Sequence, residues 1–299
     1  LTCVTIPESV TEIGEETFRD CSSLTSITIP EGVTKIGWET FKGCSSLTSI
    51  TIPKSVTEIG GGAFDGCSSL TNVKFNAKNC TSMGNYYSSV FGDCSQLTSL
   101  TIGENVTSIP NRTFYGCSSL TSVTIPKGVT KIGDSAFYGT AFYNTESNWD
   151  NNVLYIDNCL IKAKGIISGE YIIKNGIRLI GGSAFEDCSS LTSVTIPISV
   201  TEIAEEAFKD CNSLTSVTIP KSVTEIGRHA FDGCSSLTSM TIPKSVTKIG
   251  KEVFKDCSSL TSVTIPESVT EIGESAFEDC SSLTSVTIPE SVTEIGYCA

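Results

Sequence analysis

The stretch LTSVTIPISVTEIAEEAFKDCNS, residues 191–213, decides the fold, because close variants of it fill most of the 299-residue chain. Regular self-similarity of this length predicts stacked supersecondary units in a solenoid rather than a compact globule. We number the positions of each unit as slots 1 to 23, counted from its leucine. The opening phrase or a close variant of it begins at Leu1, Leu24, Leu47, Leu70, Leu97, Leu120, Leu191, Leu214, Leu237, Leu260 and Leu283.

Within one unit, apolar residues occupy slots 1, 4, 6, 10, 13, 17, 18 and 21. Val194 and Ile196 alternate with Thr195, which predicts a strand that ends at Pro197. Residues 200–203 form a second short extended stretch, and residues 205–210 are expected to form one helical turn. Phenylalanine recurs at slot 18 and cysteine at slot 21, so we expect stacked rings to form a spine inside the array.

The unit LTSVTIPESVTEIGESAFEDCSS, residues 260–282, resembles the leucine-rich repeats of the BspA-like family. The strand, the proline, Ile-Gly, Ala-Phe and the cysteine have the family spacing, and the resemblance covers nearly the whole chain. It implies an α/β repeat solenoid: a curved, right-handed leucine-rich-repeat array with a parallel β-sheet on one face and short or helical turns on the other. It also implies a cell-surface or secreted protein, for which adhesion is the usual proposed role.

The repeats predict one continuous solenoid domain with three stretches. Residues 1–142 hold six coils, the fourth with a four-residue insertion, and residues 168–299 hold six more, the first degenerate and the last truncated. Residues 143–167 break the pattern, and two apolar runs around Asp157-Asn158 predict a β-hairpin there. Neither end has a visible polar cap or a targeting signal, so we expect a fragment of a longer protein.

The charge of the chain limits its partners. Twenty basic and 33 acidic residues give a net charge of −13, which argues against nucleic acid and against an anionic membrane surface. No segment predicts membrane insertion. The charges fall on slots 8, 12, 15, 16, 19 and 20, which we expect to face solvent. His229, the only histidine, lies in slot 16 and is expected to point outward, so no catalytic residue, cofactor or metal site is predicted.

The 14 cysteines do not predict a disulfide framework, because ten of them share slot 21. A slot that is equivalent in every coil gives no reason for particular pairs, so we expect small, buried, reduced thiols there. Cys3 and Cys298 are expected to be exposed near the two ends. The pattern leaves open whether Cys3, Cys159 or Cys298 forms a disulfide.

Departures from the repeat give the candidate partner surface. Each of these departures also has a purely structural explanation. Aromatic residues mark the two insertions, substitutions mark the degenerate coil, and hydroxyls line the strand face, where threonine also simply suits an exposed strand. Two functions follow: an interaction module that adheres to an extracellular protein or glycan, or a structural spacer that projects another domain. The candidate residues are Trp149, Tyr155, Tyr143, Tyr86, Tyr87, Glu170, Ile172, Thr192, Thr195 and Thr218.

Overall fold

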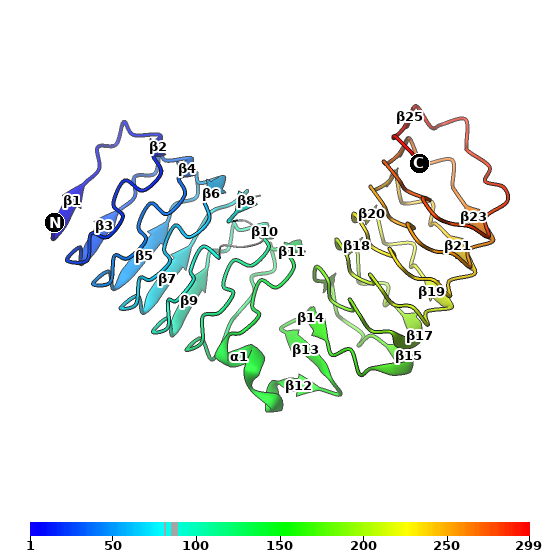
Figure 1. Cartoon of the computed structure of the whole chain (residues 1–299), viewed down its shortest axis with the longest axis horizontal. Helices are drawn as coiled ribbons and strands as arrows, with labels where there is room; N and C mark the ends of the chain where they lie inside the picture. The colour runs from blue at the N-terminus through cyan, green and yellow to red at the C-terminus, as the bar shows by residue number, and fades with distance from the viewer. Residues whose placement is uncertain (81, 85–88) are drawn as a thin grey trace. The chain divides into compact units, whose positions relative to one another are not determined.

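The computed structural model describes residues 1–80, 82–84 and 89–299. The chain forms two compact units, Leu1–Asn148 and Trp149–Ala299. Each unit is a β-solenoid with almost no helix, and the chain as a whole makes about twelve turns (Figure 1). Among the described residues, no helix is long and apolar enough to cross a membrane.

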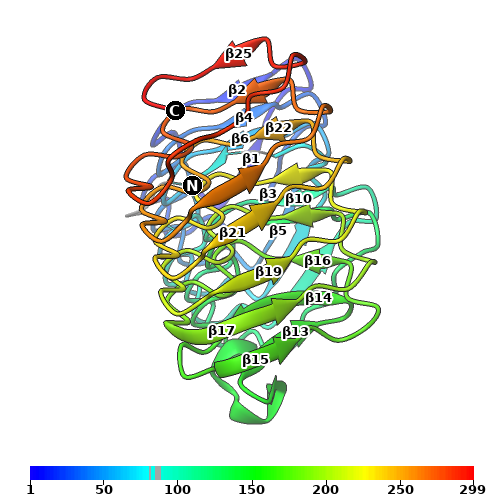
Figure 2. The same ribbon diagram turned by 90° about the vertical axis from the view of Figure 1, so that its right-hand side faces the viewer.

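A first row of strands contains slots 3 to 5, as the alternation of Val194 and Ile196 with Thr195 predicts. Within each compact unit, most neighbouring strands of the row pair in parallel with an offset of one repeat, so that Ser193 pairs with Ser216 and Thr195 with Thr218. Figure 2 shows four strands of this row in the second unit, β15 to β21, one above the next. The row consists of β1 (Cys3–Thr5), β3 (Ser26–Thr28), β5 (Ser49–Ile52), β7 (Asn72–Phe75), β9 (Ser99–Ile102), β15 (Ser168–Ile172), β17 (Ser190–Thr195), β19 (Ser216–Thr218), β21 (Ser239–Thr241) and β23 (Ser262–Thr264).

A second row of two-residue strands contains slots 12 and 13. Its isoleucines are mostly buried, and they pair in parallel from coil to coil, as Ile203 does with Ile226. The row consists of β2 (Glu12–Ile13), β4 (Lys35–Ile36), β6 (Glu58–Ile59), β8 (Ser82–Met83), β10 (Ser108–Ile109), β11 (Lys131–Ile132), β16 (Leu179–Ile180), β18 (Glu202–Ile203), β20 (Glu225–Ile226), β22 (Lys248–Ile249), β24 (Glu271–Ile272) and β25 (Glu294–Ile295).

The long break in the repeat contributes to both units. The helix α1 (Ala141–Asn144) and the 3₁₀ turn η1 (Glu146–Asn148) end the first unit, and β12 (Trp149–Asp150) opens the second. An antiparallel hairpin follows, in which β13 (Val153–Ile156) turns at Asp157 and Asn158 into β14 (Cys159–Ala163). Because β14 pairs in parallel with β16, the hairpin extends the second row of strands and closes that end of the core.

The expected helical turn at residues 205–210 is not observed. Slots 16 and 20 have left-handed backbones, with φ of 57° at Glu206 and 56° at Asp210. These residues direct the N–H groups of slots 16, 18 and 20 along the stack, where they donate to carbonyl oxygens of the next coil. The N–H of Phe208, for example, donates to the carbonyl oxygen of Ala230 at 2.9 Å. A helix would turn the same groups back into its own segment, so the coils replace helix hydrogen bonds with bonds between coils. The right-handed curvature stays a prediction.

The slot-18 phenylalanines form a stacked spine in each unit. Neighbouring rings lie 5.1 to 5.8 Å apart with interplanar angles of at most 14°. Nine of these rings, from Phe41 to Phe254, are fully buried. Offset stacking adds to the burial of a large apolar ring, so the spine accounts for a large share of the stability of each coil.

The slot-21 cysteines are free thiols, and all but the half-buried Cys21 are buried. Their sulfurs also make a regular contact that the sequence did not predict. Eight of these thiols donate to the carbonyl oxygen of the slot-18 phenylalanine one coil earlier, as Cys234 Sγ does to Phe208 at 3.1 Å and Cys257 Sγ to Phe231 at 3.2 Å, whereas Cys188 donates to Lys164. Burial raises the pKa of Cys44, Cys188 and Cys280 to about 11, so these thiols stay protonated and unreactive at neutral pH.

The glycine at slot 14 is explained by the spacing between coils. A Cβ atom added to Gly227 would lie 2.5 Å from the backbone nitrogen of Glu205 and 2.7 Å from the carbonyl carbon of Ala204. At Gly227 the second row of strands therefore packs backbone against backbone, and a side chain there would require the adjacent coil to shift.

Candidate functional site

The strand register brings four of the predicted surface residues together on one exposed face. Ile172 pairs with Thr195, which pairs with Thr218, while Glu170 lies on the same face of β15 two residues before Ile172. All four are exposed, and Ile172 leaves 66% of its surface accessible. A carboxylate and a large apolar side chain thus stand at the start of a sheet whose next strands present hydroxyls.

The exposed threonines of slot 2 have a structural contact as well. The hydroxyl of Thr215 donates to the carbonyl oxygen of Thr192 at 3.1 Å, and the same bond recurs from Thr261 to Thr238 at 3.0 Å. Slot 11 repeats this arrangement on the second row, where Thr224 donates to Thr201 at 3.3 Å. These hydroxyls bond successive coils to each other, and Thr192 takes part through its main-chain carbonyl oxygen.

The aromatic residues at the start of the second unit form a cluster with two lysines. The hydroxyls of Tyr155 and Tyr171 lie 2.7 Å apart, and the ammonium of Lys174 lies 4.3 Å from the centre of the Tyr155 ring and pairs with Asp150. Burial is the main cause that raises the pKa of Tyr155 above its usual range. Tyr155 packs against the core of this unit, so it supports the surface more than it is presented by it.

Trp149 lies beside this cluster in β12. The ammonium of Lys164 lies 4.9 Å from its ring centre, and its strand pairs with β13 through Leu154. The indole is half-buried rather than presented.

Tyr143 belongs to the first unit, where it joins an aromatic row that the sequence reading missed. Its ring lies 5.0 Å from that of Tyr138, which stacks at 5.2 Å on Tyr115, and the guanidinium of Arg112 lies 4.1 Å from the Tyr115 ring centre. Tyr138 is 46% exposed. Burial raises the pKa of Tyr143 to about 12. The two other tyrosines share slot 19 of consecutive repeats, and this recurrence was the sequence signal that could have predicted the stacking. Tyr86 and Tyr87 lie outside the described residues.

Slots 16 and 19 form a corner of the coil where some side chains that we expected to face solvent are buried. Glu39 and His229, both in slot 16, are 5% and 8% exposed. A positive φ of 49° at Glu39 and 53° at His229 turns these side chains along the stack. Each contacts slot 19 of its own coil, and Glu39 also contacts slot 19 of the preceding coil, whereas His229 contacts slot 16 of the next coil. The prediction that His229 points outward is therefore wrong, because the left-handed backbone could not be read from the amphipathic pattern.

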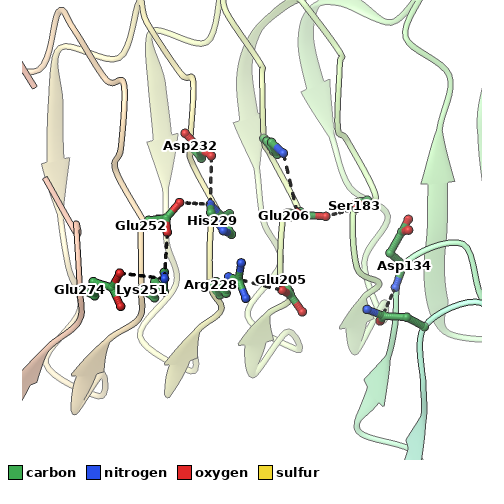
Figure 3. Close-up of polar contacts among 12 residues, drawn as sticks. Asp134, Ser183, Glu205, Glu206, Arg228, His229, Asp232, Lys251, Glu252 and Glu274 are labelled. Carbon is green, nitrogen blue, oxygen red and sulfur yellow. Dashed lines mark hydrogen bonds and ion pairs between the residues drawn. The ribbon is translucent and has the colours of Figure 1, made fainter. Parts of the chain in front are cut away.

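This corner contains two buried charge clusters. In the first unit, the Glu39 carboxylate lies 2.6 Å from Arg19 of the preceding coil and 2.7 Å from Lys42. In the second unit, Nδ1 of His229 lies 3.0 Å from Oδ2 of Asp232 and 3.2 Å from Oε2 of Glu252, as Figure 3 shows. Burial raises the pKa of Asp232, while His229 opposes that shift. The sequence reading missed this cluster because one of its members comes from the next coil.

Comparison with known proteins gives consistent matches. The family model described as BspA type Leucine rich repeat region (6 copies) matches residues 1–89, 85–212 and 178–299. A leucine rich cell surface protein from Faecalibacterium prausnitzii is 31% identical over 100% of this chain and 88% of its own, with a TM-score of 0.49. None of the curated proteins compared is a significant match.

Two further solved structures are similar. A leucine-rich repeat protein from Bacteroides ovatus is 28% identical over 97% of this chain and 88% of its own, with a TM-score of 0.40. A leucine-rich repeat protein from Eubacterium ventriosum is 25% identical over 99% of this chain and 87% of its own, with a TM-score of 0.45.

Proposed function

The chain belongs to the family of BspA-type leucine-rich repeat proteins. We propose that it is a non-catalytic interaction module, located at the cell surface or secreted, that adheres to an extracellular protein or glycan. The family membership supports the surface location, because a relative is described as a cell surface protein. The recurring residues are engaged in contacts between coils: the phenylalanines stack, and the thiols and slot-2 hydroxyls bond successive coils. These structural roles support a binding function without catalysis.

The observation that carries the proposal is the row Ile172, Thr195 and Thr218 with Glu170 beside it. An exposed isoleucine flanked by a carboxylate and by hydroxyls offers an apolar centre with polar neighbours, which is the composition of a small protein-binding patch. Exposing Ile172 serves no packing purpose in β15, whereas the residue in this slot of the other coils is usually threonine.

The test restores the repeat consensus on this patch. The double variant Glu170→Ser, Ile172→Thr copies the neighbouring strand and should leave folding intact. Binding to a panel of purified matrix proteins and immobilised glycans is measured by surface plasmon resonance. We expect affinity for any partner of the wild type to fall at least about tenfold, or ~1.4 kcal/mol. Thr241→Ala, on the same face in β21, is the matched control and should keep the affinity.

The second candidate function is a spacer, and one observation favours it. The hairpin of β13 and β14 is buried at Val153, Leu154, Cys159 and Leu160, so the main insertion closes a core instead of projecting from it. If the wild type binds nothing on the panel, or if the consensus double variant binds as well as the wild type, the spacer becomes the better account.

A further inference from the structure

Three metal-ligand side chains meet at the corner of the second unit that Figure 3 shows. Nδ1 of His229 lies 3.0 Å from Asp232 and 3.2 Å from Glu252, and the three ligand atoms all lie within 4.8 Å of one another. Their side chains are only 10%, 13% and 16% exposed, so the cluster is largely withdrawn from solvent but still reachable by a small ion.

The main chain holds these side chains in place. The N–H of His229 donates to the carbonyl oxygen of Lys251 at 3.0 Å, and that of Glu252 donates to Glu274 at 2.9 Å. The N–H of Asp232 donates back to the carbonyl oxygen of His229 at 3.2 Å, which closes the turn between the two ligands. The donors therefore come from a backbone that the stacking of coils already fixes, which is the arrangement that favours ion binding without reorganisation.

Two carboxylates compete for one ring nitrogen in this cluster. One ring nitrogen carries at most one proton, yet two carboxylate oxygens lie within hydrogen-bond distance of the same Nδ1. The two carboxylates also repel each other unless a positive charge lies between them. Lys251 neutralises part of this charge from the outer side, 3.3 Å from Glu252, but it is shared with Glu274 at 3.0 Å.

We propose that His229, Asp232 and Glu252 form a binding site for a divalent transition-metal ion, for which Zn²⁺ is the test ion. Imidazole nitrogen and carboxylate oxygen are ordinary zinc ligands, and bonds of about 2.0–2.2 Å place tetrahedral ligand atoms roughly 3.4 Å apart. The two distances from Nδ1 are already close to this value. Water completes the coordination shell, and the positive charge of the ion would offset the repulsion between the two carboxylates.

The repeat supplies a matched reference in the preceding coil. There the same two slots hold Glu206 and Lys209, whose charged atoms lie 3.8 Å apart. That pair includes an ammonium in place of a ligand, so it cannot hold a metal in the same way. Changing His229 and Asp232 to the Glu-Lys pair thus removes the site while copying side chains that this corner already accommodates.

The experiment is calorimetric titration of the folded chain with zinc chloride at neutral pH. Cys3→Ser and Cys298→Ser serve as the background, because both thiols are exposed and thiolates are zinc ligands. We expect one ion per chain and a rise in melting temperature with zinc.

Two variants decide the outcome. The double substitution His229→Glu, Asp232→Lys should abolish the one-ion binding event while preserving the melting temperature without zinc. Glu206→Gln, at the reference corner, should leave zinc binding unchanged. The proposal is overturned if zinc at about a thousandfold excess over micromolar protein produces no binding or thermal shift. It is also overturned if the double variant still binds one ion with the affinity of the background chain.

Discussion

The phenylalanine spine and the slot-16 corner are built on the same coils, but slot 18 is constant from coil to coil whereas slot 16 varies. Slot 18 holds phenylalanine in both units, and its rings stack with nearly the same geometry from Phe18 to Phe137 and from Phe185 to Phe277. Slot 16 holds a carboxylate between two cations at Glu39 and an imidazole between two carboxylates at His229. The spine thus defines the fold, whereas the corner is where individual coils acquire chemistry of their own.

The strongest way to break this comparison is to remove a ring from the middle of the spine. Phe208→Ala should lower the free energy of unfolding by about 3–5 kcal/mol, because a large buried ring leaves a cavity between two coils. Chemical denaturation followed by circular dichroism measures the loss. A cost as small as that of a surface substitution would mean that the spine does not dominate stability.

The buried thiols predict a specific alkaline instability. Burial raises the folded-state pKa of Cys188 to about 11, above the value of about 8.5 for an unfolded thiol. A group with a raised folded pKa contributes stability below its unfolded pKa and loses it as the pH rises toward the folded pKa. Cys188→Ala should therefore remove up to about 2–3 kcal/mol of the stability difference between pH 8 and pH 11.

Denaturation midpoints across this pH range check the prediction. Cys3→Ala, at an exposed thiol, is the control and should keep the wild-type pH profile. An identical loss of stability in all three proteins would show that other groups cause the alkaline transition.

The charged corner should have a smaller effect than the spine. Glu39→Gln leaves Arg19 and Lys42 facing each other without their shared carboxylate, and we expect a loss of about 1–2 kcal/mol, since both cations are about one-third exposed. Glu58→Gln interrupts the exposed pair with Lys35 and should cost less than Glu39→Gln, because solvent screens this pair. Thermal melts compare the two variants, and equal losses would show that burial at slot 16 does not strengthen the pair.

The open strand face should have the smallest effect. Thr195→Ala removes an exposed hydroxyl from β17 and should change the free energy of unfolding by less than about 1 kcal/mol. Urea denaturation against the wild type checks this. A loss comparable to that of Phe208→Ala would mean that the two faces of the strand have been interchanged.

The sequence predicted the strands, the phenylalanine spine and the buried thiols, because each depends on apolar spacing within one unit. It failed at residues 205–210, where apolar positions at Ala207, Phe208 and Cys211 suit a helix and a left-handed turn equally well. The aspartate or glycine at slot 20 was a usable signal, since both tolerate positive φ better than bulky residues do.

The candidate sites were less predictable for a different reason. The grouping of Glu170, Ile172, Thr195 and Thr218 follows from strand register and could be read from the repeat. The cluster at His229 depends on a side chain 23 positions away whose direction is set by the backbone, and the row of Tyr115 and Tyr138 depends on stacking across coils. Contacts between coils are invisible in the pattern of a single unit.

The one-period offset of the bonds between coils has a consequence for how such a chain can change length. Within the stacks, a slot-21 thiol usually contacts the carbonyl oxygen of the preceding slot-18 phenylalanine, and several slot-2 threonines contact the preceding slot-2 threonine. After an in-frame duplication or deletion of 23 codons, these groups still find equivalent hydrogen-bond partners. Recombination of the gene can therefore lengthen or shorten the array without other changes to its sequence. The cluster of His229, Asp232 and Glu252 lacks this freedom, because a coil inserted between its two contributors would separate them.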